Sequence, residues 1–288
     1  MSTAKRLMSV FEGSQKGHGQ TTVGRIGRNG KADAKSFVIR GSLTDDIVQG
    51  HIDGTQGIGA IPIKSGDVCK FGALDIDVYD LDHKALNKKI HQLKLPLHHC
   101  RSKSGGAHLF LFLKDWEPAA LVREILSEMA SAIGFSGCEV FPKQDTIIED
   151  RGDLGNFINL PYFNAEETMR YCFDKKCEAM DLDTFLTSVE KTKVSMAELN
   201  EMSFAGDRKH FGDGAYCLEL LSSLGKVTEN RNIFLFAVGV YCRKKWTDDW
   251  KKHHEEYNRL LCQPPLPASE VMQLQKSLEK KDYFYQCD

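Results

Sequence analysis

The chain has 288 residues, of which 41% are hydrophobic and 27% charged, and its formal net charge is −2. This composition is that of a globular protein with one large or two smaller domains, and it excludes collagen-like and disordered chains. No apolar run approaches the roughly 20 residues that a membrane helix needs, and the first eleven residues lack the apolar stretch of a signal peptide. We therefore expect a cytoplasmic protein with no membrane partner.

The nine cysteines include no Cys-x-x-Cys pair. Without a secretion signal, their odd number predicts reduced thiols, mostly buried as small hydrophobic side chains. Cys172 and Cys177 lie just outside the spacing usual for a structural zinc site, which is therefore not expected.

The first half of the chain alternates between strand and helix patterns. Residues 13–33 are rich in Gly, Lys and Gln, which predicts a mobile loop or an excursion outside the core. Strand patterns at 58–63 and 71–79 are followed by a helix that Asp82 caps and that runs to about Leu93. Further strands are predicted at 97–101, 107–113, 139–141 and 157–160, with an amphipathic helix at 117–133.

Strand patterns vanish from about residue 181. Helices are predicted at 182–191, 195–202, 213–224, 231–245, 248–261 and 268–280. We expect an α+β domain over residues 1–180 and an all-helical domain over residues 181–288.

Asp75-Ile76-Asp77 lies in one of the predicted strands. Residues i and i+2 of a strand point to the same face, so the two carboxylates face one point in space. Paired carboxylates suit hard divalent ions such as Mg²⁺ or Mn²⁺, and two such ions assist in-line phosphoryl transfer. The alternative is a strand face that is simply exposed to solvent.

The segment Ser102-Lys103-Ser104-Gly105-Gly106-Ala107-His108 follows the predicted strand at 97–101. A Gly-Gly turn lets backbone N–H groups approach a phosphate closely, and the hydroxyls and Lys103 add donors. The spacing is not that of a Walker loop, and an ordinary hairpin is the alternative.

The surroundings of this segment are cationic. From His83 to Lys114 there is no Asp or Glu, but there are seven Lys or Arg and five His. Such a zone in a nearly neutral protein indicates an anionic ligand, whereas a solvated helix face is the alternative.

Two further short motifs follow. Glu139-Val140-Phe141-Pro142-Lys143-Gln144 brings an acid, a lysine and an amide to the end of a short strand. Gly155-Asn156-Phe157-Ile158-Asn159-Leu160-Pro161 is a glycine turn into a strand, in which Asn156 can orient a sugar or a phosphate.

In this order and spacing, the four motifs resemble the archaeo-eukaryotic primases, in particular the primase-polymerases of phage and plasmid replication. The resemblance covers about residues 50–165. It implies an RRM-like mixed sheet as the catalytic core, and the later helices resemble the helical segment that follows this core in such primases. The third acid is usually Asp in that family, so at Glu139 the pattern departs from it, and Asp145 and Asp153 remain alternatives.

The resemblance implies a DNA-directed nucleotidyltransferase that makes or extends primers. Asp75, Asp77 and Glu139 would hold two Mg²⁺ or Mn²⁺ ions. His108, Ser104 and Lys103 would bind the triphosphate of an NTP or dNTP, with Arg101, Lys143 and Asn156 as further nucleotide contacts.

The implied partners are a single-stranded DNA template with its primer, nucleoside triphosphates, and a replicative helicase, fused or separate, in a bacterial or phage-infected cell. A non-catalytic single-stranded nucleic-acid-binding module and a repair polymerase on the same fold are the alternatives.

Overall fold

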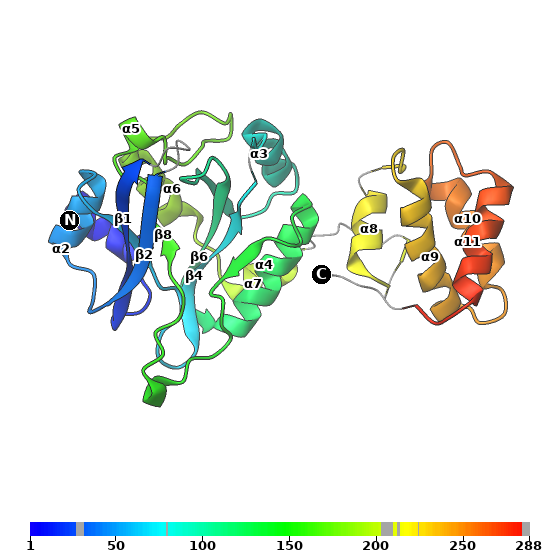
Figure 1. Cartoon of the computed structure of the whole chain (residues 1–288), viewed down its shortest axis with the longest axis horizontal. Helices are drawn as coiled ribbons and strands as arrows, with labels where there is room; N and C mark the ends of the chain where they lie inside the picture. The colour runs from blue at the N-terminus through cyan, green and yellow to red at the C-terminus, as the bar shows by residue number, and fades with distance from the viewer. Residues whose placement is uncertain (27–31, 79, 203–209, 212–213, 224, 284–288) are drawn as a thin grey trace. The chain divides into compact units, whose positions relative to one another are not determined.

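The computed structural model describes the chain except for residues 27–31, 79, 203–209, 212–213, 224 and 284–288 (Figure 1). It divides into two compact units, Met1–Met202 and Ser203–Asp288. This division lies later in the chain than the predicted boundary at 180/181. The reason is that Phe185, Leu186 and Val189, which belong to the first helix after that boundary, are buried in the core of the first unit.

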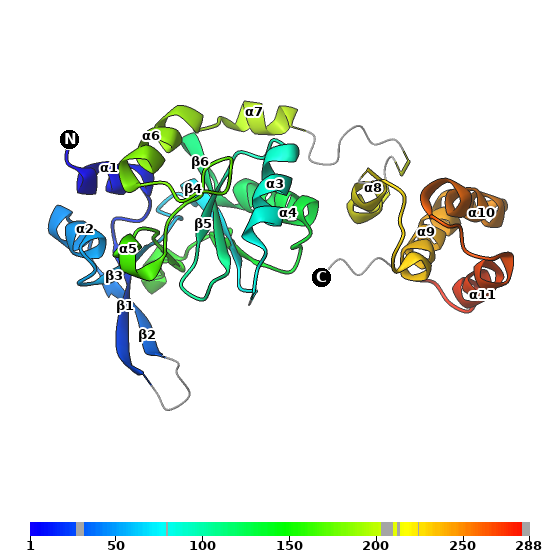
Figure 2. The same ribbon diagram turned by 90° about the horizontal axis from the view of Figure 1, so that it is seen from above.

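The first unit begins with an antiparallel sheet of order β2-β1-β3-β8. Its strands are β1 (Gly17–Ile26), β2 (Ala32–Arg40), β3 (Gly57–Ala60) and β8 (Ile158–Asn159), and α1 (Thr3–Val10) and α2 (Asp45–Ile52) accompany them. Of the mobile loop or excursion predicted for residues 13–33, the loop is wrong for the residues of β1 and β2, which form a long hairpin (Figure 2). Residues 27–31 of that prediction lie outside the described residues.

The strands of this sheet are difficult to recognise in the sequence because glycines interrupt the alternation of polar and apolar side chains. Gly19 of β1 and Gly59 of β3 are register partners, and a Cβ on either would overlap the ring of Phe157. The absence of a side chain here is a packing requirement, because the ring occupies the space that side chains would fill.

The second sheet has the order β5-β6-β4-β7. Its elements follow along the chain as β4 (Val68–Ile76), α3 (His83–Gln92), β5 (Leu97–Arg101), β6 (Ala107–Pro118), α4 (Ala119–Ile133) and β7 (Glu139–Phe141). This β-α-β-β-α-β order is the ferredoxin-like arrangement that RRM domains share, so the expected α+β, RRM-like core is confirmed. Every ladder in the two sheets is antiparallel. The expectation of a mixed sheet, with parallel and antiparallel strands, is therefore wrong.

The two faces of this sheet have different roles. Gly72 on one face packs against Val122 and Leu126 of α4. On the other face, Phe71 and Phe110 surround the ring of Phe11 at centroid distances of 5.3 and 5.0 Å. Because alternate residues share a face, Asp75 lies on the same face as Phe71, near the C-terminal end of β4.

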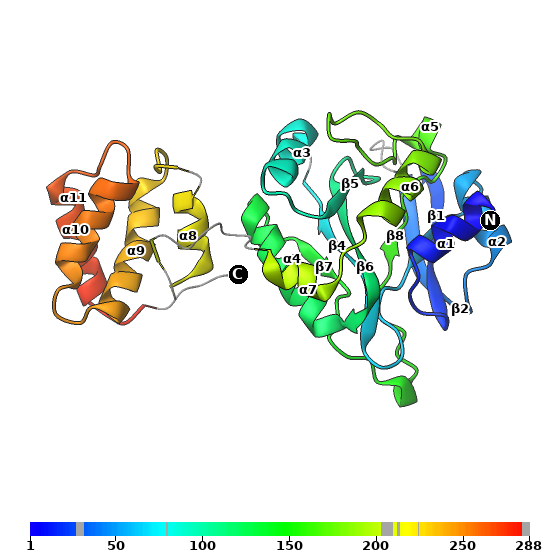
Figure 3. The same ribbon diagram turned by 180° about the vertical axis from the view of Figure 1, so that it is seen from behind.

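Helices close the first unit. They are α5 (Ala165–Thr168), α6 (Leu182–Thr192) and α7 (Met196–Glu201), and a 3-10 turn, η1, spans Glu149–Arg151. Helix α1 packs against α2 and α6 (Figure 3), so the N-terminal helix and the last part of the unit cover the same aromatic core.

The described part of the second unit is helical apart from one isolated β-bridge. It contains α8 (Tyr216–Ser223), α9 (Arg231–Lys245), α10 (Trp250–Leu261) and α11 (Ala268–Glu279), as predicted from the sequence. Gly239 of α9 lets His254 of α10 and Leu278 of α11 approach closely. Among the described residues, no helix has the length and apolar character needed to cross a membrane.

Candidate active site

The centre of the candidate site is a row of residues across three strands. Asp75 of β4 is the register partner of His108 on β6 and of Glu139 on β7. Directly opposed residues of an antiparallel pair share a face, so all three side chains start on the aromatic face of the sheet. The Nε2 atom of His108 lies 3.4 Å from Oδ1 of Asp75.

The loop between β5 and β6 approaches the end of β4. Ser104 donates a hydrogen bond from Oγ to Oδ1 of Asp77 (2.9 Å), and the hydroxyls of Ser102 and Ser104 lie 3.1 Å apart. The loop orients Asp77 beside Asp75.

The two glycines of this loop have separate functions. Gly105 has a φ of +90°, a conformation that side chains disfavour. Gly106 lies so close to the carbonyl oxygen of Ile76 that a Cβ would overlap it. The Ser-Gly-Gly sequence is thus required by a left-handed turn and by a close approach of two backbones.

One cavity of about 430 Å³ connects these groups. Six of the residues that line it were predicted from the sequence: Asp75, Asp77, Arg101, Lys103, Ser104 and His108. The other lining residues were not among the predicted site residues: Ser102, Asn159, Leu160, Pro161 and Arg170. Two carboxylates and three cationic side chains therefore share one cavity.

Arg170 is the most informative of the residues that the sequence analysis missed. It is 7% exposed, and its Nε atom has no hydrogen-bond partner among the described residues. Burial lowers the pKa of Arg170, and burial together with Arg170 lowers the pKa of Lys103. A buried guanidinium with an unused donor on a cavity wall is suited to bind an anion.

The structure also explains why Arg170 was missed. No motif surrounds it, and it reaches the site only because its segment pairs with β5: Arg101 donates from its backbone to the carbonyl of Tyr171 at 2.8 Å. The alternation of Arg170, Tyr171, Cys172 and Phe173 is the available signal, since it is typical of a short strand with one polar face.

Three of the predicted site residues do not line the cavity. Glu139 forms an ion pair with Lys143, with Nζ 2.7 Å from Oε2, and its side chain is 59% exposed. Asn156 instead hydrogen-bonds to Gln144, which joins the two short motifs that contain them. Glu139 thus pairs with Lys143, and Asn156 with Gln144, instead of facing the cavity.

The alternatives for the third acid are bonded elsewhere. Asp145 pairs with Arg123 at 2.6 Å, and Asp153 accepts from the backbone N–H of Ile148 at 3.3 Å. Of the three candidate acids, Glu139 is the one in the strand row of Asp75.

The donor set fits a hard divalent ion. Among the described residues, no three His, Cys, Asp or Glu side chains are grouped closely enough to hold a metal by themselves. Mg²⁺ is usually bound by one or two carboxylates together with substrate phosphates, and Asp75 and Asp77 supply two carboxylates on one cavity wall. Glu139 can add a third only if its side chain leaves Lys143.

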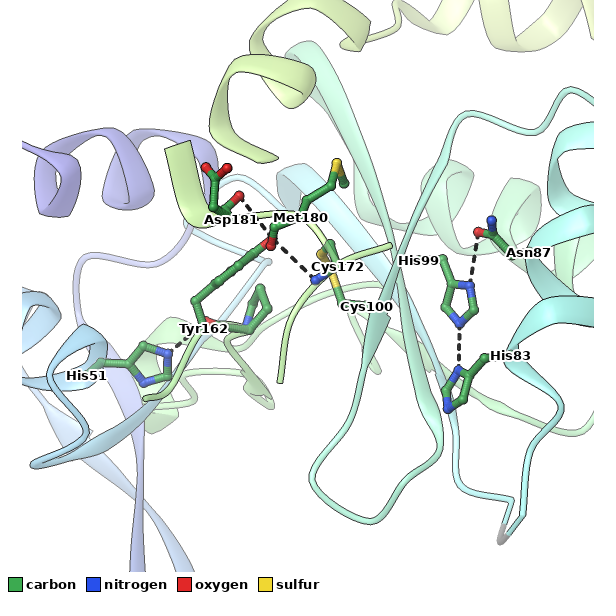
Figure 4. Close-up of a disulfide and its surroundings, with 10 residues drawn as sticks. His51, His83, Asn87, His99, Cys100, Tyr162, Cys172, Met180 and Asp181 are labelled. Carbon is green, nitrogen blue, oxygen red and sulfur yellow. Dashed lines mark hydrogen bonds between the residues drawn. A yellow bond between two sulfur atoms is a disulfide. The ribbon is translucent and has the colours of Figure 1, made fainter. Parts of the chain in front are cut away.

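A hydrogen-bonded chain holds the loop from behind (Figure 4). His83, the first residue of α3, donates from Nε2 to the carbonyl of Gly105 (2.9 Å), and its Nδ1 lies 3.0 Å from Nε2 of His99. The other nitrogen of His99 lies 3.2 Å from Oδ1 of Asn87. Burial is the main cause that lowers the pKa of His99 to about 3. The chain fixes α3, β5 and the loop relative to one another.

A disulfide lies beside this chain. Cys100 of β5 is bonded to Cys172, two residues after Arg170 (Figure 4), so the expectation that the thiols are reduced is wrong for this pair. The two cysteines are 72 residues apart, and such a pairing cannot be read from spacing alone. Within the described residues, Cys69, Cys138, Cys177, Cys242 and Cys262 have free thiols.

Comparisons with known proteins extend these observations. A solved structure described as "Crystal structure of primase RepB'" shares 10% sequence identity at a TM-score of 0.31, over 97% of this chain and 86% of that chain. No curated protein sequence matches the chain. A family model described as "TOTE conflict system, Archaeo-Eukaryotic Primase domain" matches residues 27–201, more than half of the chain. The resemblance to archaeo-eukaryotic primases is confirmed, and the matched family carries the name of a conflict system and not of phage or plasmid replication. The chain belongs to this archaeo-eukaryotic primase family of TOTE conflict systems.

Proposed function

We propose that the chain is a nucleotidyltransferase that makes or extends primers on a single-stranded DNA template from nucleoside triphosphates. The observation that carries the proposal is that Asp75 and Asp77 share one cavity with three cationic side chains. Phosphoryl transfer needs both kinds of group: carboxylates for divalent ions and cations for the phosphate oxygens.

Asp75 and Asp77, with Glu139 once it leaves Lys143, would hold Mg²⁺ or Mn²⁺. When bound, these ions neutralise charge that develops on the α-phosphate and favour deprotonation of the attacking hydroxyl. Ser104 keeps Asp77 oriented through its 2.9 Å hydrogen bond.

The cationic wall binds the triphosphate. Arg101, Lys103 and Arg170 neutralise its negative charge, and the guanidinium groups can donate two parallel hydrogen bonds to one phosphate. Ser102 and Ser104 of the loop line the same cavity, so their hydroxyls can donate further hydrogen bonds to the phosphates. His108 lies in the same cavity and donates a hydrogen bond to the phosphates.

The non-catalytic alternative, a module that binds single-stranded nucleic acid, explains this cavity less well. A module that only binds phosphates gains nothing from two carboxylates on the same wall, since like charges repel. The carboxylates are useful when a divalent ion lies between them and the phosphates.

The test is primer synthesis on a single-stranded DNA template with NTPs or dNTPs and Mg²⁺ or Mn²⁺. We expect product from the wild type, none from Asp75→Asn or Asp77→Asn, and wild-type levels from Asp115→Asn, whose carboxylate is exposed on β6. Each substitution keeps the size of the side chain and removes one charge.

Two outcomes would contradict the proposal. Product from all variants would show that these carboxylates are not used. No product from the wild type, with the DNA still bound, would favour the binding module.

A further inference from the structure

A second cavity, also of about 430 Å³, lies against α3. Its walls are one face of α3, formed by Lys84, Asn87, Lys88, His91 and Gln92, and the turn with Lys175, Lys176 and Cys177. We call these residues the α3 lysine patch. The helical members are spaced three and four residues apart, so they form one stripe along the helix.

The turn is fixed to the helix. Asn87 donates from Nδ2 to the carbonyl of Asp174 at 2.8 Å. The carboxylate of Asp174 accepts from the backbone N–H groups of Lys176 and Glu178, each at 2.8 Å. The carboxylate of Asp174 is thus turned into its own loop, and the lysines of the turn are held beside those of α3.

The lysines of the patch differ from other lysines of the chain in their ion pairs. Lysines elsewhere in the chain have acidic partners, such as Lys70 with Glu12 at 3.1 Å and Lys114 with Glu198 at 2.8 Å. No ion pair involves any of the four lysines of the patch, as far as the described residues go. After burial, the charge of Lys175 is the next cause that lowers the pKa of His91. Four exposed lysines without acids repel one another, and an anion would relieve this repulsion.

The patch is physically linked to the candidate active site. Helix α3 begins at His83, which donates to the carbonyl of Gly105 in the loop that contacts Asp77. The bonds from His83 through His99 to Asn87 connect the loop to the patch (Figure 4). An anionic strand on the patch would therefore keep a fixed position relative to the cavity.

The shape and composition of the patch select a polymer backbone over a small anion. Lys84 and Gln92 are eight residues apart on the helix, about 12 Å at 1.5 Å per residue, which is long enough for more than one phosphate. No Phe, Tyr or Trp lines the patch, so it offers no surface for base stacking. Lysines bind phosphates as point charges without a fixed geometry.

We propose that the α3 lysine patch binds the phosphodiester backbone of the single-stranded template, independently of sequence, next to the nucleotide cavity. The proposal rests on the proposed function for its choice of strand, and it adds the surface that holds it.

The test compares two triple variants of the full chain by fluorescence anisotropy with a labelled oligothymidine. One variant is Lys84→Ala, Lys88→Ala and Lys175→Ala. The matched control is Lys5→Ala, Lys64→Ala and Lys114→Ala, which removes the same charge from other surfaces of the first unit. Each lost phosphate contact lowers the slope of log K against log salt by about 0.7 for a single strand. We expect the patch variant to lose about 2 units of slope and at least tenfold in affinity at low salt, and the control to bind as the wild type does.

Equal losses in the two variants, or wild-type binding by the patch variant, would overturn the proposal. Inorganic triphosphate is added as a competitor: because it occupies the nucleotide cavity, we expect it to leave oligothymidine binding to the patch largely intact at constant ionic strength. Complete displacement by a stoichiometric amount would show that the strand binds in the cavity, which also overturns the proposal.

The experiment separates this proposal from the proposed function. Patch-dependent binding without any primer synthesis by the wild type would leave the patch standing and reject the polymerase activity. Primer synthesis by the wild type, with oligothymidine binding unchanged when the three lysines are replaced, would support the polymerase activity and reject the patch.

Discussion

The guanidinium carbon of Arg170 lies 4.9 Å from the ring centre of Phe163. The ring supports one face of the guanidinium, while its Nε remains without a hydrogen-bond partner within the described part of the chain. This arrangement keeps a buried cation positioned on the wall of the candidate cavity at some cost to stability.

Replacing Arg170 is expected to weaken nucleotide binding without lowering the stability of the fold. A hydrogen bond to a charged group contributes about 1.5–3 kcal/mol, so we expect Arg170→Met to raise the KM for the nucleotide about tenfold or more. The melting temperature should stay the same or rise, because an uncompensated buried charge is removed. Steady-state kinetics and calorimetry measure the two effects, with Arg259→Met, on the exposed surface of α10, as the control. A lower melting temperature with an unchanged KM would mean that Arg170 is structural.

The turn at Gly105 predicts a loss of activity that can be distinguished from a loss of stability. Gly105 and Gly66 have φ values of +90° and +87°, and a Cβ on either would meet no close contact. Alanine in this conformation costs about 1–2 kcal/mol. We expect Gly105→Ala and Gly66→Ala to lower the free energy of unfolding by similar amounts in urea titrations. Primer synthesis should fall at least tenfold in Gly105→Ala alone, and equal activity of the two variants would speak against a role of the loop in phosphate binding.

His51 predicts a loss of stability at acidic pH. Its Nε2 donates to the carbonyl of Pro161 at 2.9 Å, and its Nδ1 accepts from the backbone N–H of Ile58 at 3.1 Å, so the ring must be neutral. Burial is the main cause that lowers its pKa from 6.5 to about 4. Because the folded pKa lies below the unfolded one, the unfolded chain binds more protons between these values.

The contribution of His51 is therefore complete above pH 6.5 and is lost as the pH falls to about 4. A shift of this size corresponds to roughly 3 kcal/mol. We expect urea titrations between pH 7.5 and 4.5 to show a shallower loss of stability for His51→Gln than for the wild type. Parallel pH curves for the two proteins would exclude His51 as the cause.

The bond between Cys100 and Cys172 predicts a measurable difference in thiol content. Protein unfolded without a reductant should take up two fewer alkyl groups than protein unfolded with one, by mass spectrometry. Closing a loop of 72 residues stabilises a fold by roughly 4 kcal/mol, so Cys100→Ser should unfold at a lower urea concentration than Cys69→Ser, whose buried thiol is free. Equal alkylation in both conditions would show that the pair is reduced.

The sequence predicts the second sheet well because its strands are short apolar runs bounded by polar and glycine-rich segments. The strands at β5 and β7 have the predicted bounds, and Asp82 caps α3 through the N–H of Ala85 at 3.0 Å. The paired carboxylates and the Ser-Gly-Gly loop are each a short motif that can be recognised locally in the sequence, although the pairing of β4 with β6 is what brings the two motifs together. This is why six of the cavity residues could be named in advance.

The features that the sequence does not predict depend on contacts between segments that are far apart in the chain. The first sheet is rich in glycine because Phe157, far away in sequence, occupies its surface. Arg170 reaches the cavity through pairing of its segment with β5. Likewise, the acidic character of Glu139 is visible in the sequence, whereas its ion pair with Lys143 depends on the conformations of both side chains.

The pairing of β3 with β8 has a consequence for synthesis on the ribosome. Gly59 pairs with Asn159, and Ala60 pairs with Ile158, so the second sheet lies between these strands in the chain. A nascent chain cannot complete its first sheet until residue 159 has emerged, when every strand of the second sheet is already available. Until then, the edge of β3 is open to pairing with other chains, a known hazard of unpaired strands. The candidate cavity, which also needs Asn159 and Arg170, likewise cannot be complete until these residues have emerged.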